Sequence, residues 1–209
     1  MSTALAARFG SFVGHLSVAA ELETLATKLS LVTVRISSHG TRVDGVGAGI
    51  LWPLDDRLSV VTNAHVVPSA RGSGFLVESV AGRVANARVV ARDRELDLAL
   101  LALSEPPDEW PTPASIGDAR TLRAGEIVVA LGHPLGVDGA MSVGVLHAVP
   151  NADESLVRAD IRLAPGNSGG PLATLDGTVV GVNSMIAGGL GIAIPAHVAD
   201  RFAREVLSR

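Results

Sequence analysis

The segment Leu31-Val32-Thr33-Val34-Arg35-Ile36 opens a series of short, β-branched runs, and this series decides the fold. Each run ends near Gly, Pro, Asp or Asn, which are residues that commonly terminate strands. The later runs cover residues 47–52, 58–62, 74–80, 84–91, 98–103, 126–132, 141–149, 156–161, 179–183 and 190–194. Many short strands that do not alternate with helices predict an all-β barrel or sandwich, and they argue against a doubly wound parallel sheet.

The two ends of the chain have helical patterns instead. Apolar residues recur at helical spacing over residues 17–29, with Ser17 as the N-terminal cap. A second helix is expected over residues 195–207. Between residues 104 and 115 an extended connection is predicted by Pro106, Pro107, Pro111 and Pro113. The strands therefore fall into two halves of about six strands each.

The composition is that of a core-forming chain, and it excludes several classes of function. Of the 209 residues, 47% are hydrophobic and 18% are charged, which is typical of a globular domain. The 17 Lys and Arg against 21 Asp and Glu give a net charge of −4, so we expect no nucleic-acid partner. The chain has no Cys and no paired histidine spacing, so we expect no thiol nucleophile, no metal and no other cofactor.

Two apolar stretches bear on membranes and export. Residues 177–199 lack Asp, Glu, Lys and Arg, but their glycines, Asn183 and Pro195 indicate two strands around a Gly-Gly turn. Arg8 precedes a mildly apolar run over residues 9–20, which resembles a secretory signal, but His15 and several small residues interrupt it. We therefore expect no membrane span, and we favour a cytoplasmic location over a periplasmic or secreted one.

The hexapeptide Gly166-Asn167-Ser168-Gly169-Gly170-Pro171 carries the strongest chemical signal in the chain. Glycines on both sides of a serine let the backbone turn until its N–H groups face an incoming carbonyl oxygen. A polar turn between two strands is the alternative, and this pattern alone does not exclude it. A nucleophilic serine also needs an imidazole that accepts its proton and a carboxylate that orients the imidazole.

Candidates for both partners lie upstream of the serine. His65 follows the aliphatic run Val60-Val61-Thr62, where a core histidine held by one hydrogen bond is the alternative. Asp97 precedes Leu98-Ala99-Leu100-Leu101, and a carboxylate beside such a strand requires a partner because burial of an unpaired charge is costly. Backbone N–H groups at the start of the strand are the alternative partner. Three such contexts in one short chain favour the catalytic interpretation.

Three segments together resemble the motifs of trypsin-like serine proteases of the HtrA/Deg type. They are Thr62-Asn63-Ala64-His65-Val66-Val67, Asp97-Leu98-Ala99-Leu100-Leu101 and Gly166-Asn167-Ser168-Gly169-Gly170-Pro171-Leu172. Their order of His, Asp and Ser agrees with the family. The resemblance implies two six-stranded antiparallel β-barrels of the chymotrypsin and trypsin type, with the site between them. It also implies that His65, Asp97 and Ser168 are catalytic and that Gly166, Asn167 and Ser168 form the oxyanion hole.

The resemblance extends from about Leu29 to the C-terminus, and it divides the chain into segments. It implies an N-terminal helical segment over residues 1–30 and a protease domain over residues 31–209. Within that domain it implies barrels over 31–105 and 114–194 and a final helix over 195–209. The sequence departs from the family at His133, where Asn is common and where we expect a loop residue. It also stops at Arg209 without a PDZ domain, so we expect activation by such a module to be absent or supplied in trans.

The same resemblance bears on assembly. Many relatives form trimers through N-terminal aromatic residues, which implies a homotrimer built through Phe9 and Phe12. The buried face of a helix is the alternative place for these two side chains.

The substrate pocket that the resemblance implies is lined by Leu163, Ser184, Met185 and Ile186. None of these positions supplies an Asp to pair a Lys or Arg side chain, so we expect cleavage after small or medium aliphatic residues. Arg162 is an alternative partner for an acidic side chain, but strand alternation turns it away from the face that carries Leu163. Exposed aliphatic residues mark unfolded chains, so the expected substrates are unfolded or misfolded polypeptides.

Two rival interpretations come from other classes of protein. An α/β-hydrolase esterase would combine Ser168 with Asp176 and His197, but Pro171 and a strand-like run follow the serine where that fold needs a helix. A non-catalytic, chaperone-like barrel would hold unfolded chains without cutting them, and it would need no activated serine. Covalent labelling by a fluorophosphonate separates the enzyme from the binder.

Overall fold

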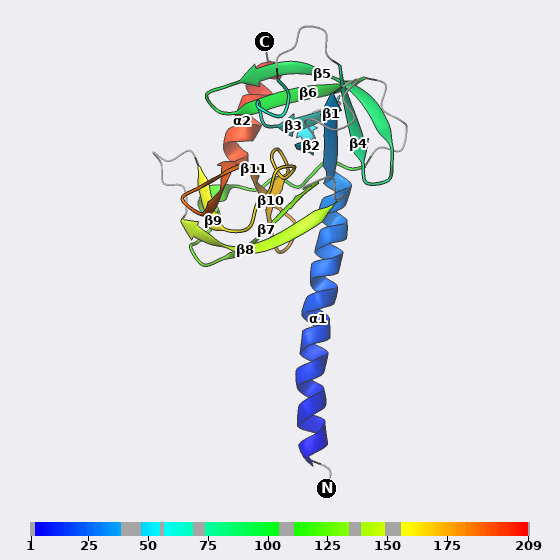
Figure 1. Cartoon of the computed structure of the whole chain (residues 1–209), viewed down its shortest axis with the longest axis vertical. Coiled ribbons are helices and arrows are strands. Elements are labelled where there is room, and N and C mark those ends of the chain that lie inside the picture. Colours follow the sequence, from blue (N-terminus) through cyan, green and yellow to red (C-terminus); the bar gives the residue numbers. More distant parts are fainter. Residues whose placement is uncertain are drawn as a thin grey trace.

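Two closed barrels, two α-helices and one short 3₁₀ helix (Ala119–Thr121) make up the part of the chain that the structure describes. The computed structural model describes residues 3–38, 47–54, 57–68, 74–104, 111–133, 139–148 and 156–208. The barrels lie one above the other, α1 projects away from them, and α2 packs where they meet (Figure 1). The expected all-β fold with two six-stranded antiparallel barrels and a helix at each end is therefore confirmed.

The first barrel closes in the order β1-β2-β3-β6-β5-β4. Its strands are β1 (Thr33–Ser38), β2 (Gly47–Leu54), β3 (Arg57–Thr62), β4 (Phe75–Ser79), β5 (Val84–Asp93) and β6 (Leu98–Ser104). The register of the antiparallel pair β3 and β6 places Thr62 opposite Ala99. Because of this register, the residues that follow β3 and those that precede β6 meet at one end of the barrel. His65 and Asp97 occupy these two segments.

The second barrel closes in the order β10-β11-β12-β9-β8-β7. Its strands are β7 (Ile127–Gly132), β8 (Ala140–Ala148), β9 (Val157–Asp160), β10 (Pro171–Thr174), β11 (Val179–Ala187) and β12 (Leu190–Pro195). The sequence patterns missed β10, because this strand is short and begins with a proline directly after the glycine-rich turn. A proline is tolerated at the first position of a strand. Ser168 stands on that turn, at the entrance to β10.

A shared apolar core joins the two barrels. It contains Ile50, Trp52 and Leu100 from the first barrel, Val182 and Ile194 from the second, and Val198 and Ala203 from α2 (Ala196–Leu207). The indole N–H of Trp52 also donates to the Asp200 carboxylate of α2 at 3.1 Å. The C-terminal helix thus fixes the barrels to each other, and the catalytic candidates of both barrels depend on that arrangement. Burial of a large apolar side chain contributes about 1.5–3 kcal/mol, so a core of this kind is a substantial constraint.

The N-terminal helix α1 (Thr3–Val32) is longer at both ends than expected. The expected start at Ser17 is wrong, because the helix begins at Thr3, where Ala4, Ala6 and Ala7 are good helix formers, and it passes through Ser17. Its continuation to Val32 moves β1 two residues beyond the expected run. Phe9 and Phe12, the residues expected to build a trimer, lie where the structure describes no side chains.

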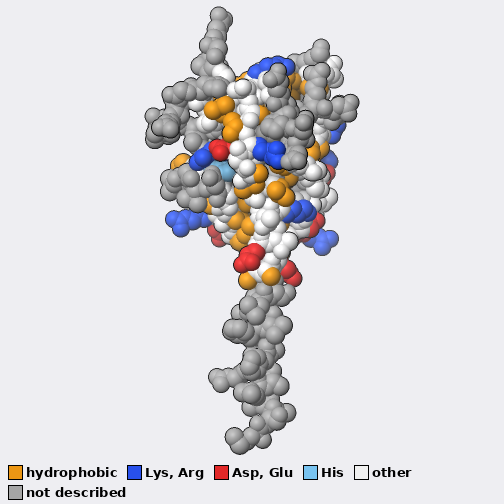
Figure 2. Space-filling model, turned by 90° about the vertical axis from the view of Figure 1, so that its right-hand side faces the viewer, with side chains coloured by type: hydrophobic (Ala, Val, Ile, Leu, Met, Phe, Trp, Pro, Cys, Tyr) orange, Lys and Arg blue, Asp and Glu red, His pale blue; other side chains and the backbone are white. Residues whose placement is uncertain are grey.

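The C-terminal part of α1 is attached to the second barrel. Leu25 and Leu29 are buried against Val129 and Leu131 of β7, and the Lys28 ammonium group donates to the carbonyl oxygen of Asp176 at 2.5 Å. Figure 2 shows acidic side chains where α1 leaves the body, with basic and hydrophobic side chains interspersed on the adjoining face. Within the part of the chain that the structure describes, no helix is long and apolar enough to span a membrane.

Candidate active site

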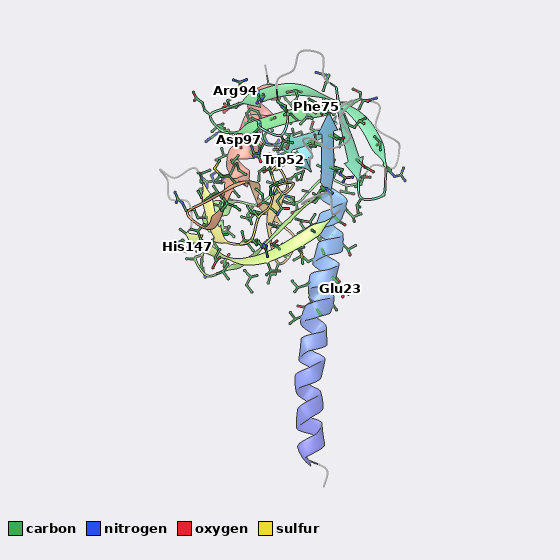
Figure 3. All side chains as sticks on the ribbon, viewed as in Figure 1. Glu23, Trp52, Phe75, Arg94, Asp97 and His147 are labelled. Carbon is green, nitrogen blue, oxygen red and sulfur yellow. The ribbon has the colours of Figure 1, made fainter. Side chains whose placement is uncertain are left out.

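A hydrogen-bonded pair of His65 and Asp97 lies at the junction of the barrels. The Nδ1 atom of His65 is 2.9 Å from Oδ2 and 3.0 Å from Oδ1 of Asp97. The backbone N–H of His65 donates to the same carboxylate at 3.1 Å. Figure 3 shows Asp97 between the two barrels, whereas His147 lies at the outer edge of the second barrel. The carboxylate therefore fixes both the ring and the backbone of His65.

Ser184 of β11 provides a further hydrogen bond to this carboxylate. Its hydroxyl donates to Oδ2 of Asp97 at 2.8 Å, across the junction between the barrels. Burial acts to raise the pKa of Asp97, but the hydrogen bonds from His65 and Ser184 outweigh burial and hold this pKa below its usual value. The carboxylate thus stabilises the fold at neutral pH, and this contribution is lost as the pH falls through the lowered pKa. At neutral pH Asp97 is ionised.

Ser168 lies on the turn that leads into β10, and its hydroxyl has a defined partner. It donates to the carbonyl oxygen of Ser184 at 2.9 Å. The Ser168 carbonyl oxygen accepts the N–H of Ala48 at 2.9 Å, which ties this turn to β2 of the first barrel. The serine is therefore held between both barrels. A rotation about its Cα–Cβ bond would turn the hydroxyl away from the Ser184 carbonyl oxygen and toward other groups that line the same cavity.

The turn before Ser168 has the geometry of a type II turn. The N–H of Asn167 donates to the carbonyl oxygen of Ala164 at 2.9 Å, and Gly166 has a φ of 105°. The N–H of His133, directly after β7, donates to the carbonyl oxygen of Gly166 at 3.0 Å. Within the described segments, the N–H groups of Gly166 and Ser168 have no backbone acceptor. Both residues line the adjacent cavity.

Gly169 is the closest contact between this turn and the first barrel. It has a φ of 85°, and a Cβ atom added to it would lie 2.1 Å from the carbonyl oxygen of Ala48 and 2.2 Å from Oγ1 of Thr62. The Thr62 hydroxyl itself donates to that carbonyl oxygen at 2.7 Å. Only a glycine fits here, because the backbone conformation and the space both exclude a side chain.

We expect Gly169→Ala to destabilise the protein more than Gly82→Ala. Both positions have positive φ values, so each alanine carries a backbone cost of about 1–2 kcal/mol. Gly82 has open space around it, whereas Gly169 faces Ala48 and Thr62 at clashing distances. Chemical denaturation of both variants measures the difference. Equal losses would contradict the close packing of the turn against the first barrel.

A cavity of about 460 Å³ connects these groups. It is lined by Gly47, His65, Val66, Pro68, Leu163, Ala164, Pro165, Gly166, Asn167, Ser168, Ser184, Met185 and Ile186. Leu163 is buried, while Met185 and Ile186 are exposed to 52% and 55%. Arg162 is exposed and is not among the lining residues. No carboxylate lines the cavity within the described segments, so its walls are mostly apolar.

The structure brings together every residue that the sequence assigned to the site. Asp97 stands behind His65, and the other candidates all line the cavity: His65, Gly166, Asn167, Ser168, Leu163, Ser184, Met185 and Ile186. Asp176 and His197, which an esterase would use, are elsewhere: Asp176 binds Thr174 and Thr178, and His197 lies 3.2 Å from Asp118. Among the described residues, no group of three His, Asp or Glu side chains could hold a metal ion.

Two contacts in the site were not foreseen. Ser184 was assigned to the pocket, but its hydroxyl binds Asp97. His133 was expected to be a loop residue, and it does follow β7, but its backbone N–H holds Gly166. Each contact joins two residues that are far apart in the sequence. The sequence could indicate only on which face of β11 Ser184 lies and where β7 ends, and neither identifies the partner.

Comparisons with known proteins agree with this geometry. A family model described as a trypsin-like peptidase domain matches residues 47–182. The chain is 36% identical to the serine protease Do-like HtrA of Bacillus subtilis, over 83% of this chain and 41% of that protein. It is also 36% identical to a probable periplasmic serine endoprotease, DegP-like, of Halomonas elongata, over 80% and 36%. The putative serine protease HhoB of Synechocystis is 34% identical, over 80% and 42%. The chain thus spans about two fifths of the length of these curated relatives.

Proposed function

The chain belongs to the trypsin-like peptidase family, among the HtrA-type serine proteases, and from this premise we propose that it hydrolyses peptide bonds of unfolded polypeptides. The observation that carries the proposal is the hydrogen-bonded pair of His65 and Asp97 beside the cavity that Ser168 lines. A pure binding barrel needs an apolar cavity, but it has no need of an ionised carboxylate that orients a histidine.

The reaction begins with a rotation of the Ser168 hydroxyl away from the Ser184 carbonyl oxygen and toward Nε2 of His65. Such a rotation between staggered positions is a small step, and catalytic hydrogen bonds often tighten only when substrate is bound. Oγ of Ser168 then attacks the carbonyl carbon of the scissile peptide while His65 accepts the hydroxyl proton. Asp97 remains ionised and stabilises the imidazolium that forms.

The negative charge that develops on the substrate oxygen is stabilised by the N–H groups of Gly166 and Ser168. The hydrogen bonds of Asn167 to Ala164 and of His133 to Gly166 support this role, because both fix the peptide between Gly166 and Asn167, which lies between the two donors. One donor of this kind is typically worth about 10²–10³ in rate. His65 next protonates the leaving amine, the acyl-enzyme forms, and a water activated by His65 releases the acid and regenerates Ser168.

The walls of the cavity favour an aliphatic side chain in the residue before the cleaved bond. Leu163 forms a buried apolar wall, and Met185 and Ile186 are exposed at the opening. An entering Lys or Arg would lose water without gaining a carboxylate partner, and an acidic side chain would not reach a cation among the lining residues. Exposed aliphatic side chains are characteristic of unfolded chains, so these are the proposed substrates.

A peptide library profiled by mass spectrometry tests this preference. We expect cleavage after Val, Ile, Ala and Leu, with broad selectivity, because one methylene changes binding by only about 1–3 kcal/mol. Leu163→Phe narrows the cavity and is expected to shift cleavage toward Ala and Val. Arg162→Ala, a change to the exposed neighbour, serves as the control and is expected to leave the profile unchanged. Dominant cleavage after Arg, Lys, Asp or Glu would contradict the aliphatic assignment.

A further inference from the structure

The backbone of Asp97 is held in an uncommon conformation. Its φ is 54°, and it is the one non-glycine residue with a positive φ in the described part of the chain. The left-handed region is unfavourable for residues with a Cβ atom, although Asp tolerates it better than most. Asp97 has this conformation directly before β6, and its carboxylate turns back toward His65. Some contact must therefore hold the Asp97 peptide in place.

Asn63 supplies that contact. Its side-chain amide donates from Nδ2 to the carbonyl oxygen of Asp97 at 3.0 Å, and the N–H of Ala64 donates to the same oxygen at 3.1 Å. Asn63 lies between Thr62, which ends β3, and His65, and it is completely buried. The short segment that carries His65 thus also binds the backbone of Asp97, the residue whose carboxylate orients His65.

The environment of the Asn63 side-chain oxygen, Oδ1, indicates that Asn63 is not there only to stabilise the fold. Oδ1 of Asn63 is buried and has no hydrogen-bond partner among the described residues. Burial of an unpaired carbonyl group offsets the gain from the single hydrogen bond through Nδ2. An apolar side chain of the same size would therefore serve stability at least as well. What an apolar side chain cannot do is hold the Asp97 carbonyl oxygen.

We propose that Asn63 is a positioning residue, which fixes the left-handed backbone of Asp97 and thereby the hydrogen bond between Asp97 and His65. The proposal rests on the proposed function for its kinetic consequence, but its structural consequence is independent of activity. Without the amide, the Asp97 peptide can rotate, and the carboxylate then loses its alignment with Nδ1 of His65. A misplacement of about 1 Å in a catalytic group typically lowers the rate by about 10²-fold.

The test is the variant Asn63→Leu, which keeps the number and branching of the side-chain heavy atoms and removes the donor. We expect kcat to fall about 10²-fold with KM nearly unchanged, because the substrate cavity is not altered. We expect the midpoint of chemical denaturation to equal or exceed that of the parent protein. Asn63→Ala is the second variant, should the leucine prevent folding.

A matched control and a second readout keep the outcomes distinct. Asn86→Leu makes the same change on an exposed position of β5, at the end of the β5–β6 pair that is remote from Leu98, and should leave kcat and KM unchanged. The proton resonance of the His65 ring N–H at Nδ1 should be broadened or lost in Asn63→Leu. Parent-like kcat and resonance in that variant would overturn the proposal, as would a loss of activity that only follows a loss of folded protein. A parent protein without turnover would contradict the proposed function, and the resonance would still test Asn63.

Discussion

Replacement of Ser168 by alanine is expected to lower kcat for hydrolysis of unfolded casein by about 10⁶-fold. The variant loses the atom that attacks the peptide carbonyl, while the N–H donors of the turn and the cavity remain. Because the Ser168 hydroxyl makes one hydrogen bond among the described residues, to the Ser184 carbonyl oxygen, its loss should change the free energy of unfolding by only about 1 kcal/mol. Casein cleavage and chemical denaturation, measured on the same preparation, separate the two effects.

Ser115→Ala is the matched control, because it removes a hydroxyl from an exposed position in the connection between the barrels. It should retain full activity. Hydrolysis at equal rates by the parent protein and by Ser168→Ala would show that another group performs the chemistry.

Replacement of Asp97 by asparagine is expected to lower kcat by about 10⁴-fold at neutral pH. The amide of an asparagine would donate to Nδ1 of His65, so the ring proton would move to Nε2 and the imidazole could no longer accept the Ser168 proton. The same amide would also face the Ser184 hydroxyl, which now donates to Oδ2 of Asp97 at 2.8 Å. Steady-state kinetics from pH 6 to 10 measure this effect, with KM expected to change little.

The exposed Asp160 of β9 offers the matched substitution Asp160→Asn, which should leave kcat unchanged. An Asp97→Asn variant that keeps kcat within about tenfold of the parent would contradict the role assigned to the carboxylate.

Much of the fold was predictable because each strand carries its own local signal. Runs of β-branched and aliphatic residues separated by Gly, Pro or Asp were enough to place most strands, and apolar residues at helical spacing indicated a helix near each end of the chain. Strand β10 was missed because four residues after a glycine-rich turn give too short a pattern. The start of α1 was misplaced because Ser17 has the residue type of a cap, whereas a cap depends on the conformation of the chain before it.

The site was predictable only where its residues belong to short motifs. His65, Asp97 and Ser168 stand in segments whose residue types already indicate an activated serine. The contacts of Ser184 with Asp97 and of His133 with Gly166 join segments that are far apart in the sequence, and they depend on the placement of one element against another. The sequence shows that Asn63 lies close to His65. The hydrogen bond from Asn63 to the Asp97 carbonyl oxygen, however, depends on the φ value of Asp97, which the sequence does not specify.

Fluorophosphonate labelling followed by peptide mapping tests the central claim most directly. The reagent forms a covalent bond with a serine oxygen only where a base accepts the proton and donors stabilise the developing charge, so it reports on the assembled site without a known substrate. We predict one adduct per chain, on the peptide that contains Ser168, with labelling lost in Ser168→Ala and strongly slowed in Asp97→Asn. No adduct on the folded parent protein would contradict the claim and favour a binding barrel, and an adduct that persists in Ser168→Ala would contradict it by showing that another residue is the nucleophile.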